Sequence, residues 1–191
     1  MQIPGMLSLA LLFGTASFGQ VLEIFDDPDK ACALLESEGF PGREWTLRPY
    51  GLQCFTTRTK TEEVSGRAQA APVDDSWPAL EVVPQGSIAY AASGESLTRV
   101  SRLKLIVFLV PDQPNKVLMA EYERLATVLL TRIGLNVSDD LRKAIRNMLP
   151  WRRALRGANI TFDPGPKPSS LLVLTVRDPR IRVETIPRVR D

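Results

Sequence analysis

The sequence lacks one residue type entirely, because none of its 191 residues is histidine. A chain without histidine cannot build a Ser-His-Asp triad, a Cys-His pair or an imidazole metal site. It also has no glycine-rich phosphate loop, no calcium-binding loop and no cysteine spacing typical of zinc sites. These absences exclude most common hydrolase designs, and we expect no metal site and no cofactor.

Long apolar runs are lacking too. The run at the N-terminus covers residues 6–13, and small and polar residues interrupt it before the about 20 residues that a spanning helix needs. A short apolar run followed by small residues is typical of a secretory signal peptide. We therefore predict a signal peptide at residues 1–19 and cleavage before Gln20. Residues 20–191 would then form a single periplasmic or secreted domain without a transmembrane span. The alternative is a buried first element of a cytoplasmic protein.

Cysteine is scarce, since Cys32 and Cys54 are the only two. An even cysteine count behind an export signal is typical of a disulfide formed in an oxidising compartment. Such a bridge closes a loop of about 22 residues and would stabilise the fold by about 3 kcal/mol in the chain-entropy model. The alternative is a pair of buried free thiols.

Charge is distributed unevenly along the chain. Residues 20–137 hold 12 basic and 16 acidic side chains, whereas residues 138–191 hold 12 basic and 6 acidic ones. The basic C-terminal part could face an anionic partner, or it could neutralise the acidic part of the same molecule.

Helical patterns occur at three places. Asp27 and Pro28 are suited to begin a helix that ends at Gly39. A longer helix is indicated before Gly134 by apolar residues at intervals of three and four, namely Leu118, Tyr122, Leu125, Leu129 and Ile133. Ser138 can cap a further helix that Pro150 ends, and we expect another helical turn over residues 151–156.

Strand patterns surround these helices. Alternating segments predict two strands in residues 44–60, a pair over 87–92 and 97–110, and further strands in 159–162, 171–176 and 181–186. This irregular order does not fit the regular alternation of a parallel sheet. We therefore predict an α+β fold with an antiparallel or mixed sheet, helices packed on one face and one disulfide.

Two regions are candidate binding sites. The first is a basic, amphipathic surface over the last predicted helical region, formed by Arg142, Arg146, Arg152, Arg153 and Arg156. Its alternative explanation is the solvated outer face of a docked helix. The second is the long irregular segment 61–85 around Trp77, because long loops often bind ligands.

These observations favour a non-enzymatic exported binding or adaptor protein of the bacterial envelope, contacting a protein or an anionic envelope component. The bacterial source is inferred from the character of the predicted signal peptide and from the excess of arginine over lysine. The chain has 18 arginines and 6 lysines, a ratio that a GC-rich genome favours. Nucleic acid is not expected as a partner outside the cytoplasm. The alternatives are a small carboxylate-based hydrolase or lyase acting on a cell-wall or polysaccharide substrate, and a structural subunit of an envelope or secretion complex.

Overall fold

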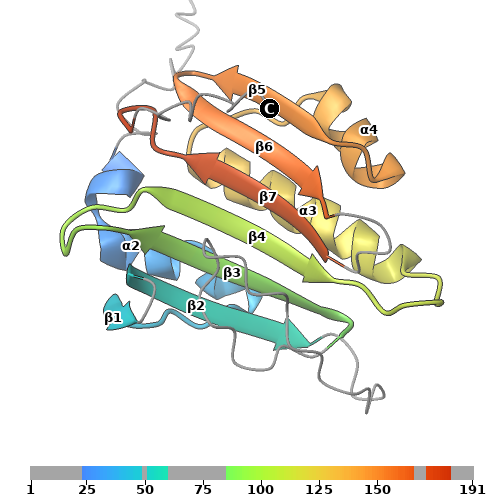
Figure 1. Ribbon diagram of the computed structural model, residues 1–191, viewed down its shortest axis with the longest axis horizontal. Coiled ribbons are helices and arrows are strands. Elements are labelled where there is room, and N and C mark those ends of the chain that lie inside the picture. Colours follow the sequence, from blue (N-terminus) through green and yellow to red (C-terminus); the bar gives the residue numbers. More distant parts are fainter. Residues whose placement is uncertain (1–22, 49–50, 60–84, 166–170, 182–191) are drawn as a thin grey trace, which may run out of the picture.

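The computed structural model describes residues 23–48, 51–59, 85–165 and 171–181. Its centre is a seven-stranded antiparallel sheet with the strand order β1-β2-β3-β4-β7-β6-β5 (Figure 1). The strands are β1 (Thr46–Arg48), β2 (Gly51–Thr59), β3 (Ser87–Gly94), β4 (Arg102–Phe108), β5 (Trp151–Leu155), β6 (Ala158–Pro164) and β7 (Leu171–Arg177). The sheet therefore consists of two antiparallel meanders, β1 to β4 and β5 to β7, which join where β4 pairs with β7.

The helices lie on one face of this sheet (Figure 1). They are α2 (Pro28–Ala33), α3 (Lys116–Arg132) and α4 (Asp139–Asn147), with the short 3-10 turns η1 (Ile24–Asp26) and η2 (Glu36–Glu38) beside α2. We call this side of the sheet the covered face and the other side the second face. The predicted α+β class, with an antiparallel sheet and helices on one face, is confirmed.

The main core lies between the covered face and the helices. Because side chains alternate along a strand, Leu103, Leu105 and Val107 of β4 point toward the helices, where they join buried residues of α3 and α4 in one apolar cluster. Tyr122 of α3 is buried there and donates a hydrogen bond to the carbonyl oxygen of Leu105 at 3.0 Å. Its ring centroid lies 6.3 Å from that of Phe162.

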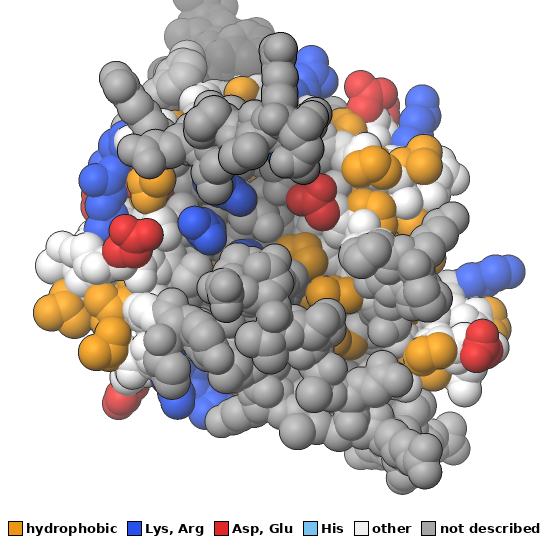
Figure 2. Space-filling model, viewed as in Figure 1, with side chains coloured by type: hydrophobic (Ala, Val, Ile, Leu, Met, Phe, Trp, Pro, Cys, Tyr) orange, Lys and Arg blue, Asp and Glu red, His pale blue; other side chains and the backbone are white. Residues whose placement is uncertain are grey.

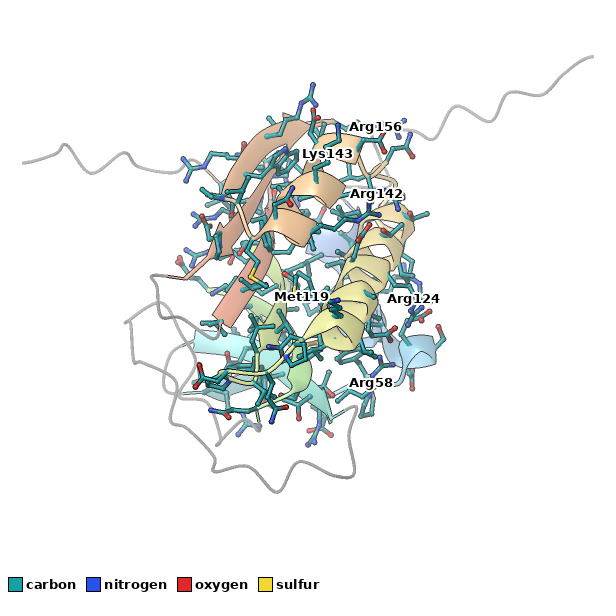
Figure 3. All side chains as sticks on the ribbon, turned by 90° about the vertical axis from the view of Figure 1, so that its right-hand side faces the viewer. Arg58, Met119, Arg124, Arg142, Lys143 and Arg156 are labelled. Carbon is teal, nitrogen blue, oxygen red and sulfur yellow. A yellow bond between two sulfur atoms is a disulfide. The ribbon has the colours of Figure 1, made fainter. Side chains whose placement is uncertain are left out.

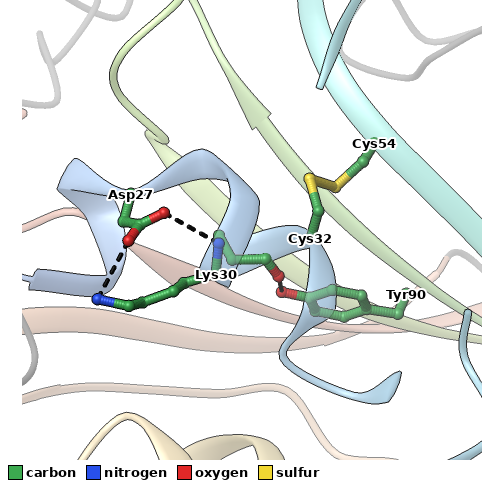
Figure 4. The surroundings of a disulfide bond; sticks show 6 residues. Asp27, Lys30, Cys32, Cys54 and Tyr90 are labelled. Carbon is green, nitrogen blue, oxygen red and sulfur yellow. Dashed lines mark hydrogen bonds and ion pairs between the residues drawn. A yellow bond between two sulfur atoms is a disulfide. The ribbon is translucent and has the colours of Figure 1, made fainter. Parts of the chain in front are cut away.

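A disulfide joins α2 to the sheet. Cys32 of α2 is bonded to Cys54 of β2, with Cα atoms 5.8 Å apart, which confirms the predicted bridge (Figure 4). Beside it, the Tyr90 hydroxyl donates a hydrogen bond to the carbonyl oxygen of Ala31 at 2.6 Å. A disulfide suggests a location outside the reducing cytoplasm.

The helix boundaries follow from capping residues. The Asp27 carboxylate accepts a hydrogen bond from the Lys30 backbone N–H at 3.0 Å, and the Ser138 hydroxyl accepts one from the Leu141 N–H at 3.3 Å. The first helix is shorter than predicted, because α2 ends at Ala33 and η2 continues the chain to Gly39, whose φ is +86°. No helix in the described part of the chain is long and apolar enough to cross a membrane.

The predicted helical turn over residues 151–156 is wrong, because Trp151–Leu155 forms strand β5. Arg156 and Gly157, with φ values of +46° and +85°, form a two-residue turn into β6. Two successive left-handed residues match the twist of an antiparallel hairpin, so the turn favours strand pairing over a helix.

Three regions of the sequence prediction lie outside the described residues. They are the signal peptide at residues 1–19, the segment around Trp77, and all but the first residue of the alternating segment 181–186. Their assignments stay predictions.

Candidate anion-binding site

The arginines predicted to form one basic surface are divided among three places in the fold. Arg142 and Arg146 lie on α4, Arg152 and Arg153 on β5, and Arg156 in the turn that follows. Figure 3 shows Arg142 and Arg156 at the end of the molecule that holds α4. The prediction placed them on one continuous helical region, whereas Arg152 and Arg153 lie on strand β5. That these arginines bind a partner stays a prediction.

On α4 the positive charge is matched within the molecule. Both oxygens of Glu123 on α3 accept hydrogen bonds from Arg146, at 2.8 and 2.6 Å, and the Arg142 guanidinium lies 3.9 Å from the same carboxylate. Hydrogen bonds to Glu123 raise the pKa of Arg146. Arg156 donates to the carbonyl oxygen of Gly134 at 2.9 Å. These side chains connect α4 to α3, and the turn to the residues that follow α3.

A second network of ion pairs holds α3 against the segment after α2. Arg124 contacts the carboxylate of Glu38 at 2.7 Å and that of Glu121 at 3.0 Å, and Arg132 contacts Glu38 at 2.7 Å. Arg58 of β2 also pairs with Glu121, and it lies near α3 together with Arg124 (Figure 3). These arginines therefore connect α3 to β2 and to η2.

A buried carboxylate organises the end of the sheet. Asp178 is fully buried and accepts hydrogen bonds from Arg99 at 3.0 and 3.1 Å and from Arg180 at 3.0 Å. Arg180 also donates to Asp26 at 2.8 Å, which ties η1 to the chain beyond β7. Burial on its own would raise the pKa of Asp178, but the hydrogen bonds from Arg180 and Arg99 outweigh it and lower that pKa.

The second face carries arginines in a different setting. Arg102 of β4 lies directly opposite Arg177 of β7, and Arg177 lies opposite Asn159 of β6. Both arginines are half-buried, and Arg152 of β5 is exposed on the same face. Figure 2 looks onto this face and shows basic side chains near its middle, separate from a group of apolar side chains. We call Arg102, Arg152 and Arg177 the cationic cluster.

The electrostatics of the cluster show that its charges lie close together. Burial lowers the pKa of Arg177, and the positive charges of Arg102 and Arg152 lower that pKa further, whereas the Asp163 carboxylate opposes the shift. The buried Nε–H group of Arg177 has no hydrogen-bond partner among the described residues. Within the same described part of the chain, none of the three arginines forms an ion pair with a carboxylate.

This arrangement is chemically suited to hold an anion. A guanidinium presents N–H donors in a planar fork that fits the two oxygens of a carboxylate or a phosphate group. In the adjacent row, the hydroxyl-bearing residues Thr175 and Thr161 lie between Lys104 and Arg152. An anion bound at Arg177 would neutralise the repulsion among the three arginines and supply an acceptor for its Nε–H group.

Sequence reasoning included Arg152 in its basic surface but did not identify Arg102 and Arg177 as a pair. Strand alternation alone places Arg102 and Lys104 on one face of β4, and Thr175 and Arg177 on one face of β7. Only the pairing of β4 with β7 brings Arg102 and Arg177 together, and no local pattern encodes that pairing. Arg153, the remaining predicted residue of β5, is exposed on the covered side.

Two pairs of carboxylates in the described part of the chain each share an arginine. Asp26 and Asp178 share Arg180, and Glu38 and Glu121 share Arg124. Searching the described ranges finds no group of three or more histidine, cysteine, aspartate or glutamate residues that could hold a metal ion. These acidic residues therefore have a structural explanation.

Comparison with protein-family models, with curated proteins and with solved structures finds no significant match to this chain.

Proposed function

We propose that this protein is a non-enzymatic binding or adaptor protein of the bacterial envelope, periplasmic or secreted. In this proposal, the cationic cluster of Arg102, Arg152 and Arg177 holds an anionic group of a protein or of an envelope component. The observation that carries the proposal is the direct opposition of Arg102 and Arg177 at the paired ends of β4 and β7. Like charges directly opposite each other destabilise a sheet, so a function in binding explains why both are present.

The chemistry of Arg177 supports the same interpretation. Its Nε–H group is buried without a partner among the described residues. A hydrogen bond between a charged donor and a charged acceptor contributes about 1.5–3 kcal/mol, whereas an unsatisfied buried donor costs about 1–3 kcal/mol. A bound carboxylate or phosphate would remove this cost, which favours ligand binding.

The disulfide supports an extracytoplasmic site of action. The bridge between Cys32 and Cys54 joins α2 to the sheet, and such bonds persist in oxidising compartments. In the periplasm or outside the cell, anionic groups are presented by acidic proteins, by phospholipid headgroups and by peptidoglycan. The test therefore includes all three kinds of anionic group.

The proposal is tested by retention of the oxidised protein on three supports: phosphatidylglycerol vesicles, peptidoglycan and a polyglutamate resin. The variant is Arg102→Gln with Arg177→Gln. The matched control is Arg142→Gln with Arg146→Gln, which removes the same charge from arginines that contact Glu123. We expect the cluster variant to lose about tenfold or more in affinity for the support that retains the wild type. The control should stay near the wild type.

Equal retention of the two double variants would contradict the proposal, because net charge and not the cluster would then govern binding. Failure of all three supports to retain the wild type would contradict it as well. Circular dichroism of each variant verifies that the fold is intact.

A further inference from the structure

Strand β5 forms one outer edge of the sheet and has β6 as its only neighbour in the described strand order. It spans Trp151–Leu155, whereas the strand at the opposite edge, β1, has only three residues. The middle of β5 is exposed, at Arg152, Arg153 and Ala154. This edge is therefore long enough and accessible enough to pair with an additional strand.

The hairpin turn defines which backbone groups of β5 face outward. Arg156 and Gly157 are the two turn residues, and Leu155 pairs with Ala158 across them. In a two-residue hairpin, the residues that flank the turn exchange both backbone hydrogen bonds, and the bonded pairs then alternate along the strand. Leu155 and Arg153 are therefore bonded to β6.

It follows that Arg152 and Ala154 direct their backbone N–H and C=O groups away from β6. Throughout the described part of the chain, these four groups have no hydrogen-bond partner. Such a row of unpaired donors and acceptors is a template for strand addition.

We propose that β5 binds an extended acidic segment of a partner protein, which adds to the sheet as a further antiparallel or parallel strand. This inference rests on the proposed binding function and names its partner. The charges favour an acidic segment, because Arg152 lies on the second face and Arg153 on the covered side. Side chains of the added strand would alternate between the two faces, so acidic residues could meet both arginines.

The charges also favour the cationic cluster as part of the same interface. Arg152 lies close enough to Arg177 to lower its pKa. An acidic side chain that reaches Arg152 from the edge therefore enters the positive field of the cluster. The backbone edge would supply affinity and the arginines would select for negative charge.

A second copy of the chain is a poor occupant of this edge. In an antiparallel pair of β5 strands, a register centred on Arg152 or on Arg153 places that residue opposite its own copy. A register centred on Ala154 places Arg152 opposite Arg156. Like charges opposite each other destabilise the pair, so the same arginines that attract an acidic segment oppose self-association.

The experiment uses a fluorescent peptide of alternating glutamate and valine and measures its binding to the full oxidised protein by anisotropy. Two further peptides carry N-methyl groups on one or the other set of alternate amides, which removes backbone donors but keeps every charge. A peptide of alternating lysine and valine is the charge control. The protein variants are Ala154→Pro, which removes an outward N–H without removing a bond to β6, and Arg102→Gln with Arg177→Gln.

We expect the glutamate peptide to bind, and one of the two N-methylated peptides to bind at least tenfold more weakly, because only alternate amides face β5. Ala154→Pro should weaken binding of the unmodified peptide at least tenfold while circular dichroism stays unchanged. The lysine peptide should not bind.

Other outcomes overturn the inference in ways that can be told apart. If both N-methylated peptides bind as well as the parent while Arg102→Gln with Arg177→Gln abolishes binding, strand addition is wrong and the proposed function stands. If the glutamate peptide does not bind while another anionic support retains the protein, the acidic partner is wrong. A protein that is dimeric by light scattering and becomes monomeric with Ala154→Pro would assign the edge to a second copy. Absence of binding to peptide, vesicles, peptidoglycan and resin alike would overturn both proposals.

Discussion

The two faces of the sheet use arginine in opposite ways. On the covered side, the arginines of β2, α3 and α4 are paired with carboxylates, namely Arg58, Arg124, Arg132, Arg142 and Arg146 with Glu38, Glu121 and Glu123. On the second face, the cationic cluster has no carboxylate in contact among the described residues, and two of its arginines oppose each other. The comparison separates arginines that connect elements of the fold through carboxylates from arginines that have no carboxylate partner in the described part of the chain.

Arg177 and Asp178 show this difference between neighbours in the sequence. Asp178 is fully buried and receives hydrogen bonds from two arginines, so its charge is compensated inside the molecule. Arg177 lies among positive charges, and its Nε–H group lacks a partner in the described residues. A partly buried charge without a compensating partner is costly to a fold, which makes Arg177 the best residue for testing the comparison.

The largest change in stability should come from removing the disulfide on the covered face. Replacing both cysteines, as Cys32→Ser with Cys54→Ser, should lower the free energy of unfolding by about 3 kcal/mol, because the bridge restricts the unfolded chain. Urea denaturation measures this change. If the two faces are independent, anion binding by the folded variant should equal that of the wild type. If the variant also lost anion binding, the two faces of the sheet would not be independent.

A smaller loss of stability is expected when Asp178 is replaced. Asp178→Asn removes a buried carboxylate whose partners Arg99 and Arg180 are 40% and 34% exposed. Breaking a fully buried ion pair costs about 3–5 kcal/mol, and partly solvated partners should reduce the loss to about 2 kcal/mol. Denaturation of this variant beside Arg177→Gln would show whether the two neighbouring residues differ as proposed.

The same carboxylate predicts a dependence on pH. Its pKa is lowered in the folded protein, so its contribution to stability is complete above the ordinary aspartate pKa of about 4 and is lost as the pH falls through the lowered value. Between pH 5 and 2, roughly the range of carboxylate titration, the wild type should lose stability more steeply than Asp178→Asn. Identical slopes in urea denaturation at several pH values would contradict this assignment.

A substitution in the cationic cluster should raise stability, whereas the cysteine and Asp178 variants should lower it. Arg177→Gln removes a like-charge pair from the paired ends of β4 and β7 and should raise the free energy of unfolding by about 0.5 kcal/mol. The same substitution should weaken anion binding. A variant that is both less stable and unchanged in binding would identify Arg177 as a structural residue and would remove the difference between the two faces.

The smallest change in stability is expected from substitutions on α4. Arg142→Gln with Arg146→Gln removes exposed ion pairs to Glu123, and such pairs contribute little to stability in water. The denaturation midpoint should stay within experimental error of the wild type at 0.15 M salt, roughly physiological ionic strength. A clear loss of anion binding in this variant would move the site to the covered side.

The sequence predicts much of this fold because local patterns encode it. Apolar repeats define α3, Ser138 caps α4, and two cysteines leave one possible bridge. β5 was missed because Trp151 and Leu155 are spaced to share a face of a helix and also of a strand. The left-handed turn at Arg156 and Gly157 decides between them.

The candidate site was harder to predict, since it depends on pairing between distant segments. Each of Arg102 and Arg177 looks like an ordinary charge at a strand end when its own strand is considered alone. The cluster forms because β4 and β7 are neighbours in antiparallel register. Strand order of this kind follows from the packing of the whole core, which no short window of sequence contains.

The junction between the two meanders has a consequence for when the protein can act. One meander ends with β4 and the other with β7, and α3 and α4 separate them along the chain. A chain in which only one meander has formed would hold one arginine of the pair and would lack the complete candidate site. Under the proposed function, anion binding would therefore begin only once β4 and β7 have paired, so binding would distinguish folded molecules from those still folding.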